Sequence, residues 1–174
     1  MGNKFWSDPT VQPKRSFKFL LYMGEGNRNI PSWVAKKVTK PSFQISETPH
    51  KFLNHTFYFP GRLEWQTIDV TLADPVSPDA SQITMDILAA SGYRVPETPE
   101  QSQIMINRAD SIFALGNVRI EQIDSDGIVI EAWDLKNAWV KEVKYGELSY
   151  ESDDMVNIDM VIRYDYATKD TTPG

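Results

Sequence analysis

Alternation of apolar and polar residues near the C-terminus is the feature that most constrains this fold. Over residues 156–166 every second residue is apolar or aromatic, and the set consists of Val156, Ile158, Met160, Ile162, Tyr164 and Tyr166. A period of two places these side chains on one face of a β-strand, because successive side chains of an extended chain point to opposite sides. The sequence therefore predicts a strand that packs one face onto an apolar core.

Shorter stretches of the same kind occur along the rest of the chain. We expect strands at residues 17–23, 33–39, 42–46, 56–59 and 63–72, with a loop at 47–49 and a break at Pro60 and Gly61. A tight turn at Asp126 and Gly127 is expected to join two further strands. A helix is expected from Ser77 to about residue 91, and a second from Thr98 through residue 105.

These elements predict a mainly β fold, a sandwich or barrel of about seven or eight strands with one flanking helix. The 174 residues suit one domain over residues 1–174, with residues 1–13 as a mobile arm and 168–174 as a frayed tail. No apolar run approaches the roughly 20 residues that cross a bilayer, so no membrane partner is expected. The net charge of −6 argues against a surface that grips nucleic-acid phosphates.

Residues that often carry chemistry occur in patterns that do not support a catalytic, cofactor or metal site. The chain has no cysteine, which excludes disulfides and thiol nucleophiles. His50 and His55 have no third ligand nearby, and the Asp124–Gly127 stretch departs from the spacing of a calcium loop. No pattern brings two carboxylates into one cleft, so we expect no enzyme and no cofactor.

Large apolar residues in a segment bounded by Pro49 and Pro60 are the most informative local feature. They predict a projecting loop or hairpin that either contacts a partner or folds back on its own barrel. Contact with another subunit is the favoured interpretation. The residues expected to make it are Lys51, Phe52, Leu53, His55, Phe57 and Phe59.

The C-terminal third contains WDLKNAWV at residues 133–140, GELSYESDDMV at 146–156 and VIRYDY at 161–166, in that order and spacing. In these segments it resembles the tail tube proteins of contractile-tailed bacteriophages. Residues 45–74 add a second similarity, a polar loop, an apolar hairpin and a long strand before a helix. The resemblance as a whole covers most of the chain from about residue 15 to residue 166.

The resemblance implies a structural subunit that forms hexameric rings, stacked into a tube related to that of type VI secretion systems. The lumen would be acidic, so that genomic DNA passes without specific binding. Candidate lumen-facing residues are Glu64, Asp69, Asp159 and Asp165. It also implies a sheath protein, a baseplate and a tail terminator as partners, and a place in the virion tail after assembly in the bacterial cytoplasm.

Two alternatives remain open on the sequence alone. One is a related baseplate or secretion-system tube component, which would share the fold. The other is a monomeric carbohydrate-binding β-sandwich that uses the five tryptophans and seven tyrosines as stacking platforms. The second would need a concave aromatic strip on one sheet.

Overall fold

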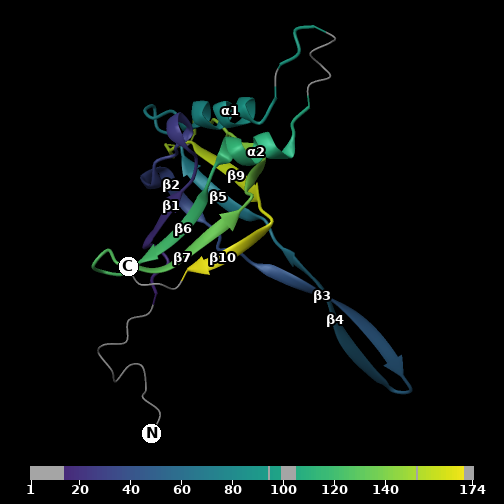
Figure 1. The fold of residues 1–174 in the computed structure, drawn as a ribbon. Coiled ribbons are helices and arrows are strands. Elements are labelled where there is room, and N and C mark those ends of the chain that lie inside the picture. Colours follow the sequence, from purple (N-terminus) through teal and green to yellow (C-terminus); the bar gives the residue numbers. More distant parts are fainter. Residues whose placement is uncertain (1–13, 94, 99–104, 152, 171–174) are drawn as a thin grey trace.

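The chain forms a β-sandwich from which one long hairpin projects (Figure 1). The computed structural model describes residues 14–93, 95–98, 105–151 and 153–170. One sheet has the order β1-β6-β7-β10, with bounds Phe19–Tyr22, Val118–Ile123, Val129–Lys136 and Tyr166–Asp170. The other has the order β2-β5-β9-β8, with bounds Ala35–Val38, Ile68–Ala73, Asn157–Arg163 and Trp139–Lys144. The projecting hairpin consists of β3 (Phe43–Phe52) and β4 (His55–Trp65).

The core lies between the two four-stranded sheets. Residues Ile68, Val70 and Leu72 of β5 are almost fully buried and pair with alternate residues of β9, which are buried too. The facing sheet contributes Val118 and Ile120 of β6 to the same cluster. Each such side chain contributes about 1.5–3 kcal/mol of burial free energy, so the alternation fixes which face of each strand turns inward.

Two helices pack against one another and cover part of this core. Helix α1 (Ala80–Ala90) begins after Asp79, whose side chain accepts a hydrogen bond from the backbone N–H of Gln82. Helix α2 (Arg108–Leu115) has an equivalent cap at Asn107. Figure 1 shows the two helices side by side at one end of the sandwich. Short 3₁₀ turns at Gly26–Arg28 and Ser32–Val34 lead into β2.

The predicted sandwich, the strand near the C-terminus and the end of the first helix at Ser91 are confirmed. The turn around Asp126 and Gly127 does join two strands. The first helix starts two residues later than predicted, after Asp79. Within the described residues there are ten strands and two α-helices, more than the predicted seven or eight strands and one flanking helix.

Two further expectations need correction. Thr98 and Met105 are not helical, and the helix after this region starts at Arg108 instead; residues 99–104 lie outside the described part of the chain. The expected frayed tail is wrong for residues 168–170, because they belong to β10 and pair with β7. The predicted arm at residues 1–13 and residues 171–174 lie outside the described residues. None of the described helices has the length and apolar character that a membrane crossing requires.

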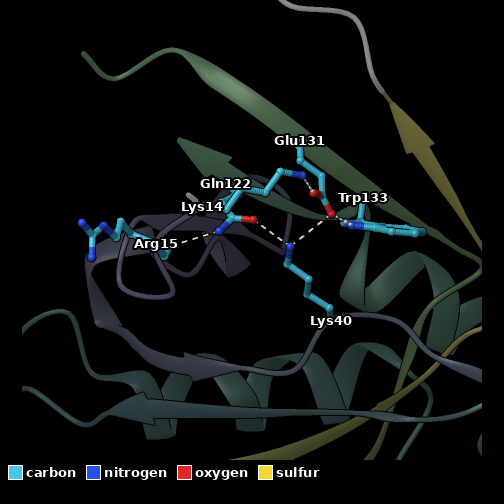
Figure 2. A network of polar contacts seen from close by, with 6 residues as sticks. All are labelled: Lys14, Arg15, Lys40, Gln122, Glu131 and Trp133. Carbon is cyan, nitrogen blue, oxygen red and sulfur yellow. Dashed lines mark hydrogen bonds and ion pairs between the residues drawn. The ribbon is translucent and has the colours of Figure 1, made fainter. Parts of the chain in front are cut away.

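A nearly buried carboxylate, Glu131 of β7, connects three parts of the chain (Figure 2). It forms ion pairs with Lys14 and with Lys40, whose Nζ lies 3.1 Å from Oε1. Trp133 donates its indole N–H to the same carboxylate at 2.5 Å. Lys40 also donates to Gln122 at 2.7 Å. Since Lys40 lies between β2 and β3, this cluster attaches the start of the hairpin to the opposite sheet.

The cluster also sets the protonation of the carboxyl group. Burial alone would raise the pKa of Glu131, but hydrogen bonds from Lys14, Trp133 and Lys40 outweigh burial and lower the pKa from 4.5 to about 2. A carboxyl group with a depressed folded-state pKa stabilises the fold above its unfolded pKa. That stabilisation is lost as the pH falls from about 4.5 through about 2.

We therefore predict that acid destabilises the wild-type protein more steeply than the Glu131→Gln variant. Between pH 5 and pH 2.5 the wild type should lose about 2 kcal/mol more unfolding free energy than the variant, because the glutamine cannot titrate. Urea unfolding followed by tryptophan fluorescence at each pH measures this difference. Parallel pH profiles would show that the ion pairs of Glu131 contribute nothing to stability.

Candidate assembly surface

The hairpin β3–β4 forms a separate two-stranded sheet outside the sandwich. Its strands pair with one another and with no other strand of the described chain. Figure 1 shows it extending well away from the sandwich. Strands of ten and eleven residues reach roughly 30 Å at the usual rise per residue. An isolated two-stranded ribbon of this kind is only marginally stable in water.

The register of the outer part of the hairpin places three phenylalanines on one face. Phe52 lies opposite His55, His50 opposite Phe57, and Thr48 opposite Phe59. Directly opposite residues of antiparallel strands share a face, and so do residues two apart along one strand. Phe52, Phe57 and Phe59, here called the aromatic face, are 62%, 48% and 57% exposed.

The opposite face of the hairpin is different in kind. It carries Lys51, Thr56, Pro49 and Tyr58, which alternate with the residues of the aromatic face. Of the six residues predicted to contact another subunit, Phe52, His55, Phe57 and Phe59 therefore share one face. Lys51 lies on the other face, and Leu53 lies in the turn.

Leu53 at the tip is unusual in two respects. Its φ of 52° lies in the left-handed region, which costs a leucine about 1 kcal/mol or more. Its side chain is also 89% exposed. The two-residue turn between Phe52 and His55 imposes this φ, because primed hairpin turns need a positive φ at their first central residue. An exposed apolar side chain at such a tip is typical of a contact that a partner completes.

The root of the hairpin, in contrast, is firmly attached to the sandwich. The rings of Phe43 and Trp65 contact edge to face at 5.5 Å between centroids, and Trp65 lies 6.0 Å from Tyr164. The backbone N–H of Gln66 donates to the carbonyl of Ser42 at 2.8 Å. The hairpin is therefore anchored at its base, and beyond it the two strands pair with no other described strand.

The expected loop at 47–49 and the break at Pro60 and Gly61 are wrong. Both segments lie inside the hairpin strands. Pairing becomes irregular between Ile45 and Glu47, and Glu47 lies opposite Pro60. A proline lacks a backbone N–H, and a β-bulge in a two-stranded ribbon tolerates this loss. The chain turns away instead at Gln66 and Thr67, between β4 and β5.

The four residues predicted to face the lumen do not share one surface. Asp69 and Asp159 lie on the outer face of the β2-β5-β9-β8 sheet, away from the core. Glu64 and Asp165 line a cavity of about 580 Å³ at the root of the hairpin. In this cavity Asp165 forms an ion pair with Arg108 and accepts a hydrogen bond from Asn137 at 2.8 Å.

The outer face of the β2-β5-β9-β8 sheet is mixed in charge rather than acidic. Asp159 accepts a hydrogen bond from Thr71 at 2.8 Å, and Lys144 lies directly across from Asp159 on β8. Lys37 lies across from Thr71 on β2. Lysines therefore lie among the carboxylates of this face, although Lys144 forms its ion pair with Glu142, and the net charge of the chain does not describe this surface.

The other candidates for chemistry have structural roles or remain isolated. Asp124 accepts hydrogen bonds from the backbone N–H groups of Asp126 and Ile128, at 2.8 and 3.0 Å, and so shapes the β6–β7 turn. His55 stacks edge to face on Phe57 at 4.9 Å. Within the described residues no three His, Cys, Asp or Glu side chains are grouped as a metal site would require.

Comparison with known proteins gives no match at the level of sequence and clear matches at the level of fold. No family model matches the chain, and no curated protein matches it. A chain of the sheath/tube terminator of an extracellular contractile injection system, PVC, is 12% identical with a TM-score of 0.67, over 92% of this chain and 99% of that chain. A chain of the PVC sheath-tube complex is 13% identical with a TM-score of 0.64, over 94% and 95%.

The tail tube of SPP1 shares the fold at greater distance, with 9% identity and a TM-score of 0.54 over 92% of this chain and 80% of that chain. These structures are described as parts of tube and sheath assemblies, not as enzymes. The chain thus has the fold of tail-tube-like proteins, as the resemblance in its C-terminal third implied.

The anchoring at the root predicts that the outer hairpin contributes little to the stability of the sandwich. Residues 48–59 can be replaced by Asn-Gly, which closes a tight turn between the paired residues Glu47 and Pro60. The unfolding free energy should change by less than about 1 kcal/mol, because the removed residues lie outside the core. Chemical unfolding measures it. A loss above about 3 kcal/mol would show that the hairpin supports the sandwich.

Proposed function

We propose that this protein is the structural subunit of a bacteriophage tail tube, stacked as hexameric rings around a lumen that conducts DNA. The exposed aromatic face of the hairpin is the observation that carries the proposal. Three phenylalanines on a ribbon outside the core are costly in water, and burial against a neighbouring copy removes that cost. The shared fold and the C-terminal resemblance support the same class of protein.

The physics of the sheet edges supports an assembly as well. Strands β1, β10, β2 and β8 are the outer strands of the two four-stranded sheets. An uncovered edge strand exposes unpaired backbone N–H and C=O groups, and closure of copies into a ring removes such edges. The proposed tube lies in the virion tail, is assembled in the bacterial cytoplasm, and meets a sheath, a baseplate and a terminator. A tube component of a baseplate or secretion system remains the second candidate, since it would use the same fold.

We predict that the purified protein forms rings or hollow tubes, and that Phe52→Asp together with Phe57→Asp abolishes them. Burying two unpaired carboxylates is costly, so the substituted aromatic face should not enter a contact between copies. The fold persists because these residues lie outside the core. Negative-stain electron microscopy and light-scattering mass, on the same concentrated samples, measure the outcome.

A matched control places two charges on the opposite face, as Thr56→Lys and Tyr58→Lys, which keep the tip basic. This variant should still assemble. Unimpaired tubes from the aromatic-face variant would remove that face from the interface. A wild-type protein that stays a monomer of about 20 kDa at every concentration would contradict the proposed function.

We place Asp69 and Asp159 on the lumen side, where their carboxylates keep DNA from binding. Asp69→Lys with Asp159→Lys should give tubes that retain short duplex DNA at low salt, because added lysines provide phosphate contacts. DNA held inside a tube resists nuclease, whereas DNA on the outside is digested. The charge-matched control is Glu25→Lys with Asp86→Lys, which should protect no DNA. Equal protection in both variants would contradict the lumen assignment.

A further inference from the structure

A second surface of the molecule is apolar, acidic and exposed. It is the loop between β8 and β9, here called the acidic loop, described at residues 145–151 and 153–156. Leu148, Tyr150 and Met155 are 83%, 110% and 66% exposed. The loop contains no lysine or arginine and borders a cavity of about 650 Å³. Its carboxylates are Glu147, Glu151, Asp153 and Asp154.

The acidic loop and the hairpin lie at opposite ends of the same sheet. Strand β5 begins at Ile68, just after the root of the hairpin, and this residue lies opposite Ile162. The other end of β5, Ala73, lies opposite Asn157, the first residue after the acidic loop. The backbone N–H of Asp74 donates to the carbonyl of Val156 at 3.0 Å, which fixes the loop at that end.

The outer hairpin is complementary to the acidic loop in charge and in polarity. Residues 48–59 contain no aspartate or glutamate and carry one lysine, Lys51, with His50 and His55. The aromatic face and Leu53 present large apolar side chains at this tip. A basic, aromatic tip suits a cavity bordered by carboxylates and by an exposed leucine, tyrosine and methionine.

The hairpin cannot satisfy this complementarity within one chain. Its tip extends away from the sandwich in Figure 1, and its root is fixed at the end of β5 remote from the acidic loop. The loop that the tip matches must therefore belong to another copy. A contact between two different surfaces, at opposite ends of each subunit, joins copies head to tail.

We propose that the acidic loop is the docking site for the hairpin tip of a second copy of this chain. The proposal rests on the proposed function and deepens it, because it names the surface that receives the hairpin. Head-to-tail contacts of this kind do not close between two copies, so each added copy presents a new acidic loop or a new hairpin to the next.

Cysteine cross-linking tests the docking site directly, because the chain has no cysteine of its own. We expect the full-length variant Leu53→Cys with Leu148→Cys to form a ladder of dimers, trimers and longer species on oxidation, reversed by reductant. Each single-cysteine variant should stop at a weak dimer. Leu53→Cys with Ile128→Cys, which uses a half-exposed residue away from the loop, is the matched control and should give no ladder.

Microscopy of the same samples separates the two proposals. If the Leu53→Cys, Leu148→Cys variant forms tubes but no cross-linked ladder, the docking site is overturned and the tube assignment stays intact. A sample with neither tubes nor any species above the monomer would overturn both. A ladder of equal strength from the control pair would show random collision and would also overturn the docking site.

Charge reversal provides an independent measurement. Glu147→Lys with Glu151→Lys should raise the protein concentration needed for assembly at least tenfold at low salt, and the difference should shrink in high salt. Adding Lys51→Glu to this variant should recover part of the loss. An assembly concentration unchanged by the loop substitutions at low salt would contradict a docking site of this charge.

Discussion

Packing of the two four-stranded sheets against one another is the interaction on which the rest of the structure depends. The buried faces of β5 and β9 meet those of β6 and β7, and the helices add Ile87 and Leu115 to the same cluster. This core holds one end of the hairpin and one end of the acidic loop in place. Because the core is complete without either, both surfaces remain available to another molecule.

Sequence periodicity was sufficient to predict the sandwich, and the reason is visible in β9. Its buried residues Ile158, Met160 and Ile162 alternate with partly or fully exposed ones, so the pattern reports burial directly. Periodicity fails in the hairpin, where neither face is buried and where Pro60, typical of a strand end, lies inside β4. It also fails at α2, whose eight residues offer too few turns for a clear apolar stripe.

The candidate site was predictable in composition but not in geometry. The aromatic residues around Phe52 and Phe57 stood out in the sequence, yet only the register shows that they share a face and that Lys51 does not. The acidic net charge gave no information about which surface is acidic. Cross-strand partners decide this point, since Lys144 lies opposite Asp159 on a face that sequence reasoning treated as acidic.

The direction of the hairpin determines what kind of assembly the chain can form. If the aromatic face met its own copy about a twofold axis, two subunits would satisfy each other and growth would stop. Lys51 lies on the other face of the hairpin and the tip carries no carboxylate, so such a pairing would give Lys51 no partner of opposite charge. The acidic loop offers compensation, and it lies at the far end of β5. Charge and position thus favour the open, repeating contact over the closed dimer, and a repeating contact is what a tube requires.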